Sequence, residues 1–195
     1  MRIPDALMAH TADLEIPLLR EDLQATCVDL PIKRWGSVSR RTQFKGTWHF
    51  YTADEKFSAL WKHPDTLLKS QCHAAIEANF STGDQMPLPV VLYRIYQKRW
   101  LARFWQDFGN VKIWVDLNVA EEWQELNLHG VPKGWKAYAT AVTDERLDTL
   151  KVHAEIAHSH AEGKPLLLVY GGGKKTAKIC EQNEFIHVRE QKDGR

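Results

Sequence analysis

The chain has 195 residues, of which 44% are apolar, so it is long enough to form one domain with a sizeable core. Lysine and arginine number 26 and aspartate and glutamate 25, so the overall charge selects no partner and only local clusters can do so. Three cysteines without CxxC or zinc-finger spacing exclude a disulfide framework and indicate reduced thiols. We find no signal-peptide pattern and no apolar run of the roughly 20 residues that cross a bilayer, and therefore expect a cytoplasmic protein without a membrane partner.

The N-terminal part, residues 1–45, differs from the rest of the chain. Residues 1–25 are acidic and contain two prolines, which predicts irregular or helical structure packed on the body. Residues 33–45 carry five basic residues and no acid, with serine and glycine between them, which predicts a loop or an arm. The segment TCVDL at 26–30 is a weaker candidate for a strand.

Residues 46–190 alternate between strand and helix patterns and form the rest of a single domain that spans 1–195. Strands are predicted at residues 46–51, 72–77, 111–117, 136–140, 165–170 and 185–190. Helices are predicted at 52–61, at 89–108, from Thr143 to Gly163 and after the glycines at 171–173. Thr52, Asn118 and Thr143 are interpreted as helix caps.

This order predicts an α/β fold with a mostly parallel sheet of about six strands joined by right-handed crossovers. A closed (β/α) barrel needs eight strands. The sequence therefore favours either an incomplete TIM-like barrel or an open doubly wound sheet, and periodicity does not separate the two.

Two acidic residues stand at the ends of apolar strands, where parallel sheets bind ligands. Glu77 and Asp116 are costly to bury there unless they are paired or coordinated. Two carboxylates on one edge could act as general acid and base, or hold a divalent metal as cofactor. The alternative is a structural role for each carboxylate, bonded to loop amides or to basic side chains.

A glycine loop follows the most apolar strand. Gly171, Gly172, Gly173 and Lys174 precede a short helix, a geometry in which backbone N–H groups bind phosphate. The spacing matches neither a Walker loop nor GxGxxG. A tight strand-to-helix turn is the alternative explanation.

Two basic stretches with interleaved aromatic residues indicate nucleic acid as a partner. Their candidate contacts are Lys33, Arg34, Arg40, Arg41 and Lys45 in the basic loop, and Arg94, Lys98, Arg99 and Arg103 in the helix at 89–108. The alternative is a solvated amphipathic helix, because dedicated nucleic-acid binders are usually basic overall.

Histidines His153, His158 and His160 share the helix that follows Thr143. No acid or cysteine completes a zinc set with them, so we interpret them as a solvated helix face.

Several blocks, taken in order, resemble the DUF4417 family, which is common in phage and plasmid genomes. They are WHFYTADEKFSALWKHP, IEANFSTGDQMPLPVVLYRIYQKRWLARFWQDFG, VKIWVDLNV, VPKGWKAYAT and LLLVYGG, and they span about residues 44–172. The family's usual aspartate in its PDFS block is Asn79 here, so a catalytic acid is not expected at that position. Because the family has no established activity, the resemblance implies a mobile-element setting and no catalytic residues.

Three functions remain open at this point. The first is a mobile-element protein that binds nucleic acid, and the second is an enzyme acting on a phosphorylated or nucleotide substrate. The third is a non-catalytic protein that binds a host protein partner.

Overall fold

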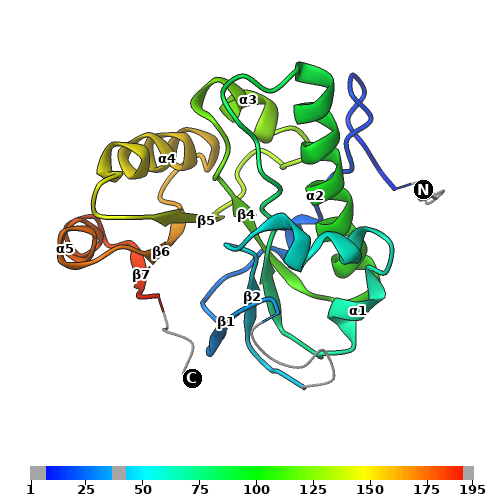
Figure 1. Ribbon diagram of the computed structural model, residues 1–195, viewed down its shortest axis with the longest axis horizontal. Helices are drawn as coiled ribbons and strands as arrows, with labels where there is room; N and C mark the ends of the chain where they lie inside the picture. The colour runs from blue at the N-terminus through cyan, green and yellow to red at the C-terminus, as the bar shows by residue number, and fades with distance from the viewer. Residues whose placement is uncertain (1–7, 37–42, 191–195) are drawn as a thin grey trace.

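The computed structural model describes residues 8–36 and 43–190, and its centre is a curled sheet of seven parallel strands (Figure 1). Each strand pairs with its neighbours in the chain, so the order β1 to β7 never reverses. A doubly wound sheet requires such a reversal, and the fold is therefore an incomplete barrel. The strands are β1 (Ile32–Arg34), β2 (Thr47–His49), β3 (Ala74–Ile76), β4 (Lys112–Asp116), β5 (Ala137–Val142), β6 (Leu166–Gly171) and β7 (Ile186–Val188).

The curl of the sheet brings distant strands together on its inner face. The rings of His49 on β2 and Tyr170 on β6 lie with centroids 4.2 Å apart, although three strands separate β2 from β6 in the sheet. Tyr51, just after β2, also stacks on Tyr170 at 5.7 Å. A flat sheet would hold strands this far apart well beyond side-chain contact, because neighbouring strands are about 4.8 Å apart. Rings from β2, from the residues just after it and from β6 therefore meet across the curl of the sheet.

Helices flank the sheet on its outer side, and α2 is the longest of them (Figure 1). The predicted helix at 89–108 is confirmed, and it ends where Asn110 adopts the left-handed conformation with φ of 50°. No helix within the described ranges is both long and apolar enough to span a membrane. The helices are α1 (Asp65–Leu68), α2 (Leu88–Gly109), α3 (Gln124–Asn127), α4 (Leu147–His160) and α5 (Lys174–Asn183), with 3₁₀ turns η1 (Glu21–Leu23), η2 (Asp54–Lys56), η3 (Ser58–Trp61) and η4 (Glu121–Trp123).

Three kinds of local expectation failed: the seventh strand, one helix and the helix caps. The seventh strand is β1, not residues 26–30, so Lys33 and Arg34 belong to the sheet and not to a loop. Residues 52–61 form two 3₁₀ turns in place of an α-helix. The predicted caps are wrong, because α4 starts after Arg146 without a side-chain cap, and η2 and η4 follow alanines.

One ion pair fixes α2 on the sheet. Arg99 of α2 donates through Nη1 to Oε1 of Glu77, directly after β3, and both side chains are fully buried. The other guanidinium donors reach the backbone oxygens of His129 at 3.0 Å and Asn127 at 2.6 Å, so they are satisfied within the protein. Breaking such a pair leaves a buried charge without compensation, which costs far more than the pair contributes.

We expect Glu77→Gln to lower the free energy of unfolding by roughly 3–5 kcal/mol, because Arg99 would keep its buried charge without a counter-ion. Urea unfolding monitored by circular dichroism measures the loss. Glu125→Gln is the matched control, since Glu125 is exposed on α3. Equal stabilities of the two variants would contradict a structural role for Glu77.

Candidate functional site at the carboxyl ends of the strands

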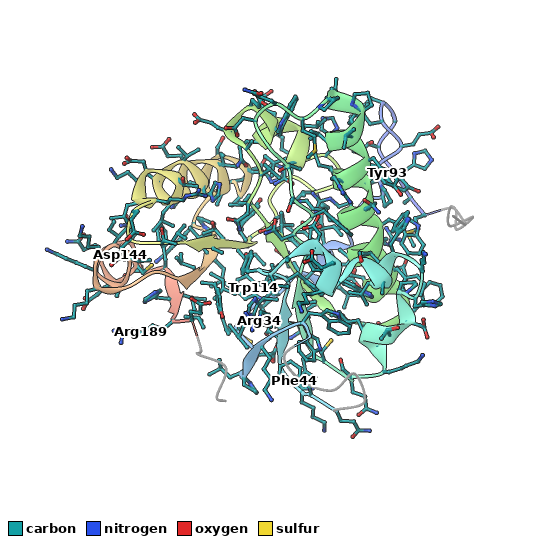
Figure 2. All side chains as sticks on the ribbon, viewed as in Figure 1. Arg34, Phe44, Tyr93, Trp114, Asp144 and Arg189 are labelled. Atoms are coloured by element: carbon teal, nitrogen blue, oxygen red, sulfur yellow. The ribbon has the colours of Figure 1, made fainter. Side chains whose placement is uncertain are left out.

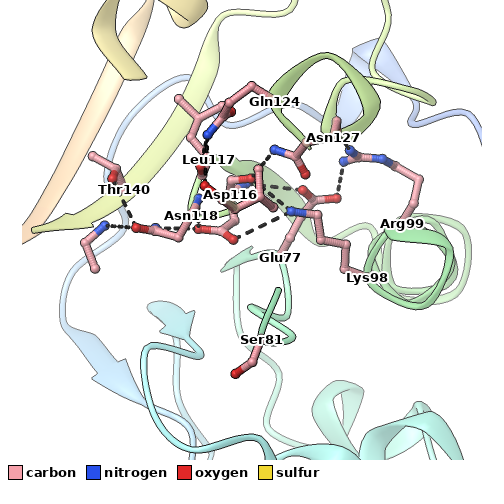
Figure 3. A network of polar contacts seen from close by, with 12 residues as sticks. Glu77, Ser81, Lys98, Arg99, Asp116, Leu117, Asn118, Gln124, Asn127 and Thr140 are labelled. Atoms are coloured by element: carbon pink, nitrogen blue, oxygen red, sulfur yellow. Dashed lines mark hydrogen bonds and ion pairs between the residues drawn. The ribbon is translucent and has the colours of Figure 1, made fainter. Parts of the chain in front are cut away.

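The two predicted carboxylates meet at one edge of the sheet (Figure 3). Glu77 follows β3 and Asp116 ends β4, and both are fully buried. Glu77 Oε2 accepts a hydrogen bond from the backbone N–H of Asp116 at 3.2 Å. With Arg99 on its other oxygen, both oxygens of Glu77 are bonded within the protein and the side chain is fully buried, which favours the structural interpretation of this residue.

Asp116 lies at the centre of a second set of contacts. Its Oδ1 accepts from the backbone and side-chain N–H groups of Asn118 at 3.2 and 2.7 Å. Its Oδ2 lies 3.7 Å from Nζ of Lys98, a side chain that is 2% exposed. When the Asn79 amide is oriented with its nitrogen toward these oxygens, it donates to the same Oδ2 at 3.2 Å. Burial lowers the pKa of Lys98, and the charges of Asp116 and Glu77 partly oppose that shift.

These contacts do not support a metal ion held by Glu77 and Asp116. Basic groups of Lys98 and Arg99 take the positions beside the two carboxylates that a cation would need. Within residues 8–36 and 43–190, no three histidine, cysteine or acidic side chains gather into a group that could hold a metal. Both carboxylates are thereby bound to the protein's own cations.

A chain of hydrogen bonds leads from Asp116 outward to α4. Beyond Asn118, the Thr140 hydroxyl donates to Asn118 Oδ1 at 3.4 Å, and Nδ1 of His153 lies 2.8 Å from that hydroxyl. The other ring nitrogen of His153 lies 3.1 Å from Nε2 of Gln124. Thr140 and Asn118 thereby connect the buried ring of His153 on α4 to Asp116.

Gln124 is left with one unused group. Its Nε2 donates to the backbone oxygens of Leu117 at 3.0 Å and Val119 at 3.1 Å, while its Oε1 is buried without a partner. The residue is 6% exposed. A buried acceptor without a partner is uncommon in native proteins and calls for an explanation.

Gln124 and His153 line a cavity of about 430 Å³ that we call the rim cavity. It lies beyond the ends of β4 and β5, between the loop after β3, the loop after β4 and the first turns of α4. Its lining residues are Thr82, Asp84, Asn118, Val119, Ala120, Glu121, Gln124, Ala141, Arg146, Asp148, Thr149, Val152 and His153.

A second cavity, of about 360 Å³, has a different character. It lies between the N-terminal segment and α2, away from the strand ends, and its lining is almost wholly apolar: Leu14, Ile16, Trp61, Pro89, Leu92, Tyr93 and Tyr96. The rim cavity is thus the one that combines the ligand-binding edge of the sheet with polar side chains.

The amides at the helix end of the glycine loop are already bonded to Asp144. Backbone N–H groups of Gly173 and Thr176 donate to Asp144 at 2.8 and 3.0 Å, and the Thr176 hydroxyl donates to the same oxygen at 2.7 Å. The Thr176 hydroxyl and these amides hold the pKa of Asp144 well below its usual range. Asp144, labelled beside α5 in Figure 2, therefore occupies the position predicted for a phosphate at Gly171, Gly172, Gly173 and Lys174.

The tight-turn explanation accounts for a glycine in this loop. Gly172 has a φ of 67°, and a Cβ there would overlap the side chain of Thr176. Only glycine adopts that conformation without strain and without displacing the threonine that holds Asp144.

The basic residues of α2 mostly point into the protein or are paired. Lys98 and Arg99 are buried in the network beneath the strand ends, which corrects their assignment to a nucleic-acid surface, since a phosphate backbone cannot reach them. Arg103 donates to the backbone oxygen of Leu18 and to Asp107. Arg94 donates to Gln97 at 3.2 Å, and its guanidinium lies 5.5 Å from the centre of the Phe80 ring.

The basic loop is only partly within the described residues. Lys45 is exposed, and Nζ of Lys33 lies 5.3 Å from the centre of the Phe44 ring. Arg34 ends β1. Arg40 and Arg41 lie outside the described residues.

Sequence reasoning missed Gln124 and misplaced His153. His153 is 2% exposed, so the solvated-face interpretation is wrong for it, whereas His158 is exposed as expected. The missed signal was helical spacing, since His153 shares its face with Leu150 and Ala157, which are fully buried. No pattern marked Gln124, whose role depends on the path of the loop after β4.

Burial makes His153 a pH-sensitive element of the site. Burial lowers the pKa of His153 from 6.5 to about 4, with the nearby Lys98 charge adding to the shift and Asp116 opposing it. A depressed histidine pKa means that the unfolded chain binds the proton first as pH falls. Stability contributed by neutral His153 is therefore complete above pH 6.5 and is lost between that pH and about 4.

We expect His153→Gln to flatten the pH dependence of stability, removing roughly 2 kcal/mol of the loss that occurs between pH 7 and 5. Urea unfolding at several pH values measures this slope. Some slope should remain, because burial also lowers the pKa of His49 to about 3. The control His158→Gln changes an exposed residue of the same helix, and an identical slope in both variants would refute the assignment.

Comparison with known proteins places these features in a family. Residues 8–145 match the family described as "Domain of unknown function (DUF4417)", so the match begins and ends earlier than the resemblance at 44–172 indicated. The Gene 1 protein of Mycobacterium phage L5 is 26% identical over 153 residues, covering 74% of this chain and 64% of that protein. The Gene 1 protein of Mycobacterium phage D29 is 24% identical over 184 residues, covering 90% of this chain and 66% of that protein.

The chain thus spans just under two thirds of the length of these curated relatives, both of which are phage proteins. No solved structure matches it. Since the family match covers most of the sequence, including β1 to β5 and the whole Glu77–Asp116 network, the protein belongs to the DUF4417 family.

Proposed function

We propose that this protein binds a small polar ligand in the rim cavity. The observation that carries the proposal is the position of a 430 Å³ cavity at the carboxyl ends of β4 and β5, with the buried side chains of Gln124 and His153 in its lining. Parallel sheets bind ligands at this edge because the loops there converge. Cavities of roughly 300–1,000 Å³ accommodate typical small ligands.

The network behind the cavity supports binding because it holds the polar side chains in fixed orientations. Asn118, Gln124 and His153 each bond to other buried groups, so little ordering entropy remains to be lost when a ligand arrives. Asp116 orients this set without touching the cavity itself. We therefore assign it a positioning role.

Filling the cavity tests the proposal. Thr149 is exposed at the cavity mouth, so we expect Thr149→Trp to fold normally and to block ligand entry. In a thermal-shift screen of nucleosides, nucleotides, amino acids and amines, a ligand at 100 times its Kd should stabilise the unaltered protein by about 2.7 kcal/mol. The same ligand should leave Thr149→Trp unshifted.

Glu155→Trp provides the matched control, because Glu155 is exposed on α4 and does not line the cavity. It should respond to the ligand as the unaltered protein does. A ligand that stabilises Thr149→Trp equally would place binding elsewhere, and a screen without any ligand would argue against the proposal.

Nucleic-acid binding is a second candidate, supported by the run of basic residues without acids at 33–45 and by similarity to phage proteins. Of this run, Lys33 and Lys45 are the lysines, and neither takes part in the buried ion-pair network. Lysines in such positions neutralise backbone phosphates without reading sequence.

If this candidate is right, the logarithm of the association constant for duplex DNA should fall linearly with the logarithm of the salt concentration. Each phosphate contact contributes about 0.9 to the slope, so Lys33→Ala/Lys45→Ala should reduce its magnitude by up to roughly 1.8. Fluorescence anisotropy at several salt concentrations measures the slope. Lys62→Ala, at an exposed lysine on another surface, is the control, and absence of salt-dependent binding would eliminate the candidate.

A further inference from the structure

Three aromatic rings meet at right angles in the second cavity, the one between the N-terminal segment and α2. Trp61 ends η3, and its ring centre lies 6.2 Å from those of both Tyr93 and Tyr96 on α2, at interplanar angles of 87° and 78°. Figure 2 labels Tyr93 on the side of α2 next to the N-terminal segment. Two flat walls at a right angle each turn one face toward the corner between them, and all three rings line this cavity of about 360 Å³. We call this group of three rings the aromatic corner.

The lining of the second cavity offers little to an ion that needs water or hydrogen bonds. Its other members are aliphatic, and none of the described residues that line it carries a charge. The indole nitrogen of Trp61 is buried, so the hydroxyls of the two tyrosines are the polar side-chain groups that remain. A phosphate or a primary ammonium would lose its hydration here without replacement, which is unfavourable.

One acid stands beside the second cavity. Glu15 is exposed between Leu14 and Ile16, both of which line the cavity. Burial raises the pKa of Tyr96, the negative charge of Glu15 adds to that shift, and no base within the described residues opposes it. The Glu15 carboxylate therefore acts on the aromatic corner, and the local field favours a cation.

From the ring geometry and this charge we infer that the second cavity binds a small molecule that carries a quaternary ammonium group. The negative faces of aromatic rings attract such a group, whose charge is surrounded by methyl groups. It therefore suits a lining of rings and aliphatic side chains. The inference uses no residue of the rim cavity, so it goes beyond the proposed function and does not depend on it.

Two probes of the same shape test the need for charge. Choline has a charged nitrogen where 3,3-dimethyl-1-butanol has a neutral carbon. Titration of the ¹⁵N-labelled protein with choline should shift the backbone amide signals of Leu14, Ile16 and Leu92, which line the cavity. Choline should bind at least about twofold more tightly than the alcohol, which is the smallest effect expected of a cation on an aromatic face. Ethanolamine, a primary ammonium, should bind more weakly than choline.

Removing one ring tests the aromatic corner. Tyr93 is 36% exposed, so Tyr93→Leu, which keeps an apolar side chain, should fold normally. It should weaken choline binding about two- to fivefold, the range for one cation–π contact at an exposed site. Tyr93→Phe keeps the ring and is the matched control, with its affinity for choline unchanged. Equal affinities of the two variants for choline would overturn the role of the rings.

Removing the acid tests the local field. Glu15→Gln should weaken choline binding by about 1.5- to fivefold, the range for an exposed ion pair. Glu21→Gln, at an exposed acid of η1 that does not line the cavity, should bind choline as the unaltered protein does. An affinity in Glu15→Gln equal to that in Glu21→Gln would overturn the contribution of the Glu15 charge.

The remaining outcomes concern the ligand and its place. Equal binding of choline and 3,3-dimethyl-1-butanol would overturn the cationic ligand, and choline that leaves the signals of Leu14, Ile16 and Leu92 in place would overturn the site. Choline that shifts Val119 and Thr149 instead would move binding to the rim cavity. Sedimentation with phosphatidylcholine vesicles checks the source of the group, since binding of vesicles without binding of choline would overturn a small-molecule ligand. All these outcomes leave the proposed function of the rim cavity to its own ligand screen.

Discussion

The structure depends on one physical constraint, the burial of four charged side chains where α2 meets the ends of β3 and β4. Glu77, Arg99 and Asp116 are fully buried and Lys98 is 2% exposed, so each charge must be neutralised within the protein. Arg99 meets Glu77, and Lys98 meets both the carboxylate and the backbone oxygen of Asp116. The strand ends and α2 can form this arrangement only in one register, so the network specifies how the helix lies on the sheet.

The same constraint determines what remains available for function. The two carboxylates that looked most suited to catalysis are paired with the protein's own cations, and the polar network continues from them through Asn118 to the buried side chains of Thr140 and His153. Hydrogen bonds polarise one another along such a chain, so the buried Asp116 orients groups that it does not contact. Gln124 ends the chain and lines the rim cavity, while its unused oxygen is buried.

Much of the fold could be predicted because its signals are local. The parallel order followed from alternating strand and helix patterns, and the buried β6 followed from its continuous apolar run, in which Leu167, Leu168 and Val169 are at most 1% exposed. The failures arose where tertiary contacts override local preference. A glycine loop before a helix suggested phosphate, but Asp144, 29 residues before Gly173, already binds its amides. Basic residues on α2 suggested a charged surface, but nothing local distinguishes an arginine that faces solvent from one that faces a buried glutamate.

The family match covers one part of the candidate site and leaves out the other. The matched region, 8–145, contains the buried network, Asn118, Gln124 and the lining acids Asp84 and Glu121. It stops before α4, which supplies Thr149, Val152 and His153 to the opposite wall. The charged lining residues lie on both sides of this boundary, with Asp84 and Glu121 inside the match and Arg146 and Asp148 outside it. The rim cavity is therefore built jointly by the strand edge within the match and by α4 and the turn before it outside the match.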